Sequence, residues 1–169
     1  MRRYLTLLLA ALCFISSCGY RLGGLRKGSM KKLNTYSVDM FANETLYPNV
    51  AMQITTAVSD CMQRDGTYRL ASPDKCDFTV SGVVTSVQAN GLRTNAGDTY
   101  LSSEIGLTVH VDFTITNRRT GRALFTRTVR AQGSFFNDDT GNVQTARDSA
   151  LSYATRRAAE LIVQTLTMP

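Results

Sequence analysis

Strict alternation between residues 105 and 116 is the feature that most limits the fold of this 169-residue chain. Every second position is apolar, and the positions between are polar or glycine: Ile105, Leu107, Val109, Val111, Phe113 and Ile115 alternate with Gly106, Thr108, His110, Asp112, Thr114 and Thr116. A period of two is that of a β-strand with one buried face and one polar face. The chain must therefore build a sheet, and Asp112 is the only acidic residue on the polar face of this strand.

Three more segments have strand character. Residues 34–41 alternate, residues 78–88 are rich in valine, and residues 123–133 follow the tight hairpin sequence 118–121. The phase slips at Gly82, which predicts a bulge or a close backbone approach. The segment 90–99 is polar and contains glycine and asparagine, so we expect a loop there.

Two segments have helical spacing of apolar residues. The first runs from about Pro48 to Arg64, with proline tolerated at the helix start and Gly66 as the stop. The second covers about residues 145–166 and carries a stripe of alanines that allows close packing against a sheet. We therefore predict an α+β fold, a two-layer sandwich with two helices packed on one face of a mixed four-stranded sheet.

The first 17 residues have the layout of a secretory signal. Arg2 and Arg3 precede an apolar run over residues 4–15, which is shorter than the roughly 20 residues of a membrane-spanning helix. The sequence Ile15-Ser16-Ser17-Cys18 resembles the bacterial lipobox. The resemblance implies cleavage before Cys18 and attachment of acyl and diacylglycerol groups to it, with no other cofactor. Several chains on one residue give stable anchoring to a membrane.

The predicted domain organisation follows from this cleavage. Residues 1–17 are the signal peptide, residues 18–33 a basic, glycine-rich lead, and residues 34–169 a single α/β domain. Gly19 follows the lipobox cysteine where lipoproteins retained in the inner membrane usually carry aspartate. We therefore expect the protein on the periplasmic side of the outer membrane.

Cys61 and Cys76 are the two cysteines left after the signal peptide and the acylated Cys18. Disulfides persist in oxidising compartments, and two thiols allow one intramolecular pairing. We predict a Cys61–Cys76 disulfide, with two reduced and partly buried thiols as the alternative. These cysteines and the single His110 lack the spacing of a zinc site, so no metal is expected.

The mature chain also resembles a known family. Cys18-Gly19-Tyr20-Arg21-Leu22, Phe41-Ala42-Asn43-Glu44-Thr45, Pro48, Tyr68-Arg69-Leu70-Ala71 and the alanine-rich last helix together resemble the LPS-assembly lipoprotein family LptE. The resemblance implies a non-enzymatic protein that assists assembly of the β-barrel LptD, plugs it, and binds lipopolysaccharide during transport to the outer leaflet. The Cys61/Cys76 pair and the basic lead depart from the family's usual pattern.

Arginine is the residue type expected to bind the phosphates of lipid A, because guanidinium groups grip phosphate in bidentate fashion. The candidate residues are Arg93, Arg118, Arg119, Arg122 and Arg130. A solvated hairpin with charges that favour solubility is the alternative. The formal charge of +6 falls to +4 when Arg2 and Arg3 leave, and export makes nucleic acid an unlikely partner.

The sequence leaves two other functions to compare with this one. An outer-membrane lipoprotein that activates a periplasmic peptidoglycan synthase would also use a small α/β domain, but usually with a long proline- or glutamine-rich tether. A lipid-anchored hydrolase needs a catalytic constellation, and no recognisable nucleophile motif accompanies His110 and Asp112. We therefore expect no enzyme activity.

Overall fold

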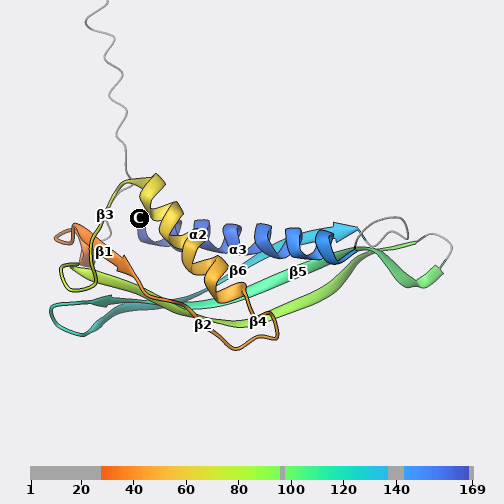
Figure 1. The fold of residues 1–169 in the computed structure, drawn as a ribbon, viewed down its shortest axis with the longest axis horizontal. Coiled ribbons are helices and arrows are strands. Elements are labelled where there is room, and N and C mark those ends of the chain that lie inside the picture. The colour runs from red at the N-terminus through yellow and green to blue at the C-terminus, as the bar shows by residue number, and fades with distance from the viewer. Residues whose placement is uncertain (1–27, 96–97, 137–142, 168–169) are drawn as a thin grey trace, which may run out of the picture.

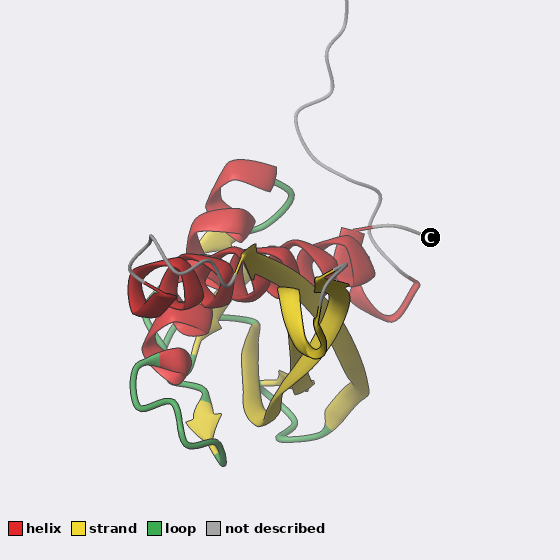
Figure 2. Cartoon of the chain, turned by 90° about the vertical axis from the view of Figure 1, so that its right-hand side faces the viewer, coloured by secondary structure: helices red, strands yellow, loops and turns green. Residues whose placement is uncertain are grey.

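A mixed β-sheet carries both α-helices on one of its faces in this computed structural model (Figure 1). The structure describes residues 28–95, 98–136 and 143–167. In chain order the elements are η1 Gly28–Met30, β1 Thr35–Val38, β2 Ala42–Asn43, α2 Val50–Asp65, β3 Arg69–Leu70, β4 Phe78–Asn95, β5 Asp98–Asn117, β6 Ala123–Phe136 and α3 Val143–Thr167. The predicted α+β class is confirmed, and the end-on view shows the helices on one side of the twisted sheet (Figure 2).

The sheet order is β3-β1-β4-β5-β6, and β2 pairs with β4 beyond the end of β1. β1 is parallel to β4, since α2 lies in the connection between them, whereas β4, β5 and β6 form an antiparallel meander. The sheet is mixed as predicted. It has two short strands more than predicted, because β2 and β3 contain only two residues each and leave no periodic signal.

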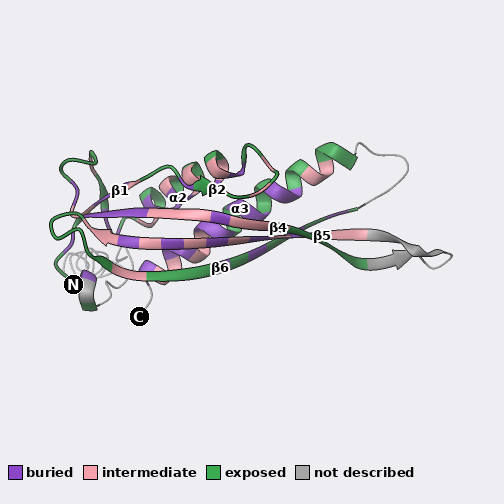
Figure 3. Ribbon diagram, turned by 90° about the horizontal axis from the view of Figure 1, so that it is seen from below, coloured by how far each residue is buried: buried purple, intermediate pink, exposed green. Residues whose placement is uncertain are grey.

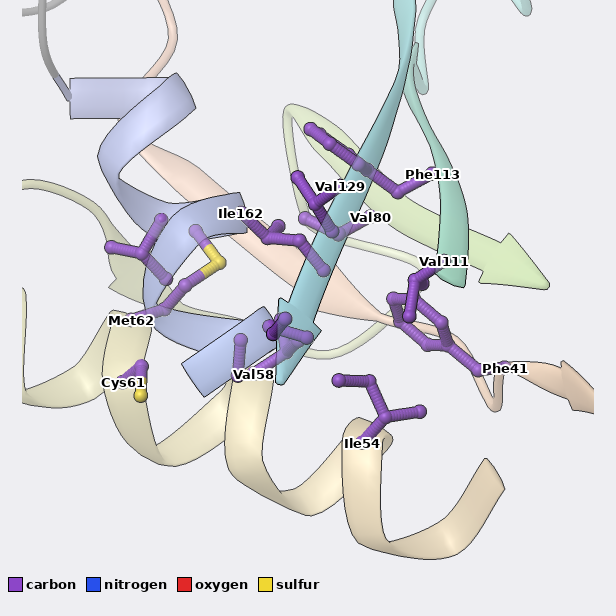
Figure 4. Close-up of a cluster of buried hydrophobic side chains, with 14 of the residues drawn as sticks. Phe41, Ile54, Val58, Cys61, Met62, Val80, Val111, Phe113, Val129 and Ile162 are labelled. Atoms are coloured by element: carbon purple, nitrogen blue, oxygen red, sulfur yellow. The ribbon is translucent and has the colours of Figure 1, made fainter. Parts of the chain in front are cut away.

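The alternating run in β5 supplies the centre of the core. Its apolar residues from Leu107 to Ile115 are fully buried, and Val111 pairs with Val84 of β4 and Val129 of β6. Figure 4 shows these side chains meeting residues of both helices, including Val58 of α2 and Ile162 of α3. The helices therefore cover the apolar face of the three long strands.

The hairpin of β4 and β5 is longer than the sequence predicted. β4 continues to Asn95 and β5 begins at Asp98, so the expected loop over 90–99 is wrong. The register shifts three times between Gly91 and Asn95. Such irregularities allow glycine and asparagine to pair with the opposite strand. Cross-strand pairing here overrides weak local propensity.

Gly82 marks a close approach and not a bulge. It keeps its register opposite Phe113, and a Cβ atom at this position would overlap the ring of Phe41. The first register shift in the strand comes later, between Val84 and Ser86.

Cys61 and Cys76 are free in the structure, so the predicted disulfide is wrong. Cys61 lies on α2 and belongs to the core between helices and sheet. Cys76 contacts Ser37 Oγ at 3.3 Å and is buried outside that core. Ser37 alternates with Tyr36, which faces the helices, so the two thiols occupy opposite sides of the sheet.

Packing of the domain begins inside the predicted lead. Met30 is fully buried and Leu33 is 7% exposed, and both belong to the core. The remainder of the lead, residues 18–27, lies outside the described residues.

The closest approach between α3 and the sheet depends on Gly133 in β6. A Cβ atom there would overlap the backbone carbonyl oxygen of Ala150 in α3. Ala150, Ala154 and Ala158 are all buried on the same helix, so small residues on both elements set the spacing. Because the overlapping oxygen belongs to the backbone of Ala150, no side-chain rotation can relieve the overlap.

We expect Gly133→Ala to lower the free energy of unfolding by about 1–3 kcal/mol, as overpacking does. This loss would oppose the usual gain when alanine replaces glycine in a strand. Urea unfolding measures the change. Gly28→Ala is the control, since nothing lies within 4 Å of a Cβ atom at Gly28. An equal effect of both substitutions would contradict the packing explanation.

Candidate functional site

The second face of the three long strands carries no helix, and we call it the open face. Alternation and register place mostly hydroxyl and amide side chains on it: Ser81, Ser86, Gln88, Thr108, His110, Asp112, Thr114, Thr116, Thr126, Thr128, Arg130, Gln132 and Ser134. Figure 3 views the sheet from this side, and β6 is largely exposed. The predicted polar face of β5 is confirmed as the middle of a wider polar surface.

Hydrogen bonds between neighbouring strands organise this surface. The Thr128 hydroxyl donates to Asp112 Oδ1 at 2.6 Å, and the hydroxyls of Thr114 and Thr126 are 2.9 Å apart. Cross-strand pairs of this kind stabilise a sheet. The carboxylate of Asp112 therefore serves β5–β6 pairing.

His110 and Ser86 form the polar pair nearest the centre of the open face. Ser86 Oγ lies 2.9 Å from His110 Nδ1, and Arg130 stands opposite His110 on β6. A nucleophile–base pair needs a third group that orients the base. Asp112 bonds to Thr128 instead, and no bond between Asp112 and His110 is found on the described chain. The Ser86–His110 pair and the Thr128–Asp112 pair are therefore two separate hydrogen-bonded pairs.

The β5–β6 turn forms the second candidate region, which we call the basic hairpin and define by Arg118, Arg119 and Arg122. All three are exposed. Gly121 adopts a left-handed φ of 64°, and the backbone N–H of Asn117 donates to the Arg122 carbonyl at 2.9 Å. The turn thus presents three guanidinium groups from a fixed backbone.

Asp77 ties the basic hairpin to the start of β1. Its Oδ2 accepts hydrogen bonds from the backbone N–H of Asn34 at 2.8 Å and of Thr35 at 3.0 Å, and its carbonyl accepts from the N–H of Arg118 at 2.9 Å. The bond from Asn34 is the main cause that holds the pKa of Asp77 below its ordinary value, and nearby Arg119 lowers it further. The carboxylate therefore stays charged beside the arginines.

The structure does not bring the five predicted arginines together. Arg118, Arg119 and Arg122 share the basic hairpin, whereas Arg130 lies within β6 on the open face. Arg93 pairs with Glu104 near the far end of the β4–β5 hairpin. At about 3.3 Å per residue, Glu104 is roughly 40 Å along β5 from the hairpin turn. Nothing is described of the Arg93 side chain.

Asn43 and Thr45 build an ordered loop between β2 and α2 that was not predicted from the sequence. Asn43 Nδ2 donates to the Tyr47 carbonyl at 2.8 Å, and its Oδ1 accepts from the N–H and hydroxyl of Thr45. Tyr47 then accepts a hydrogen bond from Arg147 of α3, whose guanidinium lies 4.9 Å from the ring centre. The Asn-x-Thr sequence was the available signal. Leu46 at the loop tip is 99% exposed.

A groove of about 710 Å³ between α2 and α3 was also not predicted. Met52, Asp60 and Arg64 line it from α2, and Ser152 and Arg156 from α3. It lies on the outer side of the helix layer, away from the open face. Its lining leaves no periodic signal, because it joins residues about 90 positions apart in sequence.

The described segments contain neither a cluster of metal ligands nor a membrane-spanning helix. No group of three or more histidine, cysteine or acidic side chains gathers there to hold a metal. Within residues 28–167, apart from the two gaps, no helix combines the length and apolar character needed to cross a bilayer. Cys18, the predicted lipid attachment site, lies outside the described residues.

Solved structures of bacterial proteins share this fold. CT253 of Chlamydia trachomatis is 11% identical with a TM-score of 0.57, covering 80% of this chain and 96% of that one. PelC of Paraburkholderia phytofirmans, solved as a dodecamer, is 14% identical with a TM-score of 0.54, covering 86% and 95%. A candidate lipoprotein of Caulobacter crescentus is 16% identical with a TM-score of 0.51, covering 74% and 87%.

These similarities define the class of fold. No protein-family model and no curated protein sequence matches the chain. At identities below one fifth, the shared property is the two-layer architecture, which a candidate lipoprotein also adopts.

We expect Asp77→Asn to remove a part of the stability that depends on pH. A folded-state pKa below the unfolded value adds stability that is present at neutral pH and is lost as pH falls below about 4. The variant should therefore be less stable than the parent at pH 7, and the difference should shrink in acid. Urea unfolding between pH 7 and pH 2.5 measures it.

Asp74→Asn is the matched control, because Asp74 is exposed in the same turn region. Its stability difference from the parent should stay small at every pH. A difference for Asp77→Asn that does not change with pH would show that the charge of this carboxylate has no role.

Proposed function

We propose that this protein is an outer-membrane lipoprotein that assists assembly of an LptD-type β-barrel, occupies its lumen and takes part in lipopolysaccharide transport. The observation that carries the proposal is the open face. It is a long sheet surface on which hydroxyl and amide groups predominate, with Leu92 and Phe136 exposed on it toward the β4–β5 tip, and the helices lie on the other side. The lipobox and LptE-like sequence segments supply the cellular context.

The open face suits the interior of a large barrel. Barrel lumens are polar and the largest ones hold a plug, whereas the outward apolar band is about 25 Å tall. β5 contains 20 residues, so at about 3.3 Å per residue the sheet extends roughly 65 Å. A domain of this length can line the full height of a lumen. Its hydroxyl groups can exchange bonds with water or with polar barrel side chains.

The start of the domain relates the open face to the membrane anchor. Asn34 and Arg118 both contact Asp77, so the chain enters the domain at the end that carries the basic hairpin. Residues 18–28 can span at most about 35 Å. An acylated Cys18 would hold Gly28, the first described residue, within that reach of the membrane surface.

The basic hairpin is the part of the site best placed for the phosphates of lipopolysaccharide. Its three arginines are exposed on a fixed turn at the end where the chain enters the domain. Charge-assisted bonds from guanidinium to phosphate are stronger than neutral hydrogen bonds. Arg130 and Arg93 are too far along the strands to join the same phosphate contact.

Purification of the acylated protein from detergent-solubilised outer membranes tests the main proposal. We expect a large β-barrel protein to remain bound in stoichiometric amount after a detergent and salt wash, because a plug is enclosed by its partner. Cys18→Ser should leave the protein unanchored and reduce recovery of the complex. Recovery of a peptidoglycan synthase without a barrel would overturn the proposal and favour the activator alternative.

The hairpin is tested with purified lipopolysaccharide as the probe. We expect the double substitution Arg118→Gln/Arg119→Gln to weaken binding by about tenfold, the equivalent of about 1.4 kcal/mol. Arg156→Gln/Arg157→Gln on α3 removes the same charge elsewhere and should have little effect. Equal losses in the two variants would show that only net charge matters.

A further inference from the structure

β6 forms one edge of the sheet. It contains 14 residues and pairs only with β5 among the described parts of the chain. No other described strand pairs with β6. The backbone N–H and C=O groups that point away from β5 therefore have no strand partner there.

From Phe125 onward this edge lacks the bulges, prolines and short length that usually block strand addition, and its two charged side chains are the exception. Natural sheets protect edges with bulges, prolines, very short strands or charges. The register from Phe125 to Phe136 follows β5 without a shift, and the strand contains no proline. A long, regular edge of this kind is a template for an added strand.

Two arginines are the only charged residues in β6. Arg127 and Arg130 are both exposed, and neither makes an ion pair within the described residues. Arg130 lies on the open face with Thr128, whereas Arg127 has the parity of Val129 and lies on the helix side. Positive charge thus flanks the edge on both faces of the sheet.

The charge pattern argues against a second copy of this chain at the edge. β6 contains no acidic residue. Pairing of two β6 strands would place four guanidinium groups along one seam without a carboxylate, and like charges across strands are destabilising. A partner strand with acidic side chains on both of its faces has the complementary charge.

We propose that the β6 edge binds an extended, acidic segment of a partner protein, which adds to the sheet as a further strand. Backbone hydrogen bonds supply the attraction, and carboxylates opposite Arg127 and Arg130 fix the register. Because these arginines lie three positions apart and face opposite ways, the segment needs acidic residues at a similar odd spacing. This edge borders the proposed barrel contact of the open face, and Arg130 belongs to both surfaces.

Synthetic peptides test the inference on the folded domain. The probe is a peptide of about ten residues, rich in threonine and valine, with two glutamates three positions apart. The matched peptide carries lysines in place of the glutamates. We expect the glutamate peptide to bind more tightly and to slow amide hydrogen exchange in β6, whereas the lysine peptide should not.

A charge swap sharpens the test. Arg127→Glu/Arg130→Glu should weaken binding of the glutamate peptide by at least about tenfold and allow the lysine peptide to bind. Arg118→Glu/Arg119→Glu, away from the edge, is the control and should leave the peptide preference unchanged. The comparison of the two peptides on the parent protein needs no variant, so it stands even if a variant folds poorly.

Three results would overturn the inference. The first is equal binding of the two peptides, and the second is slowed exchange in β4 without any change in β6. The third is concentration-dependent self-association of the parent protein with slowed exchange in β6, which would identify a second copy as the occupant. Co-purification of a barrel in the earlier experiment is compatible with any of these, so the two proposals fail independently.

Discussion

One-sided burial of the three long strands is the constraint on which the rest of the structure depends. Both helices pack against the face that contains Val111, and the small residues Gly133 and Ala150 let α3 approach the strands closely. With the apolar side covered, the opposite side must remain stable against water, and its hydroxyl side chains do this by bonding across strands. A polar sheet face is therefore a consequence of how the core forms.

The periodic spacing of apolar residues predicted the long strand β5 and both helices. The alternation centred on Val111 and the two helical spacings were right, because burial of one face imposes a period on the sequence. The length of the β4–β5 hairpin was not predictable from Asn90 or Gly91, since pairing with the opposite strand holds them extended. The free thiols of Cys61 and Cys76 depend on which side of the sheet each occupies, which counting cysteines cannot reveal.

The candidate site was predicted less well, for a geometric reason. The arginine positions follow no period, so the sequence does not show that Arg93 and Arg118 are near opposite ends of a long hairpin. Only the tight turn could be located from sequence, and its three arginines do lie together. The Asn43-to-Tyr47 loop reached α3 through Arg147, a contact between residues 100 positions apart that no local pattern encodes.

The basic hairpin and the β4–β5 tip lie at opposite ends of the long strands. The hydrogen bonds of Asp77 join the chain entry at Asn34 to the turn at Arg118, so the chain entry and the basic hairpin belong to one end. The β4–β5 tip extends away from that end along the strands (Figure 1). If Cys18 is acylated, residues 18–28 can hold Gly28 no more than about 35 Å from the membrane. The tip would then lie farther from the anchor, and the open face would span the distance between them. A partner that encloses the domain must accommodate both ends, whereas a strand added to β6 contacts only its side.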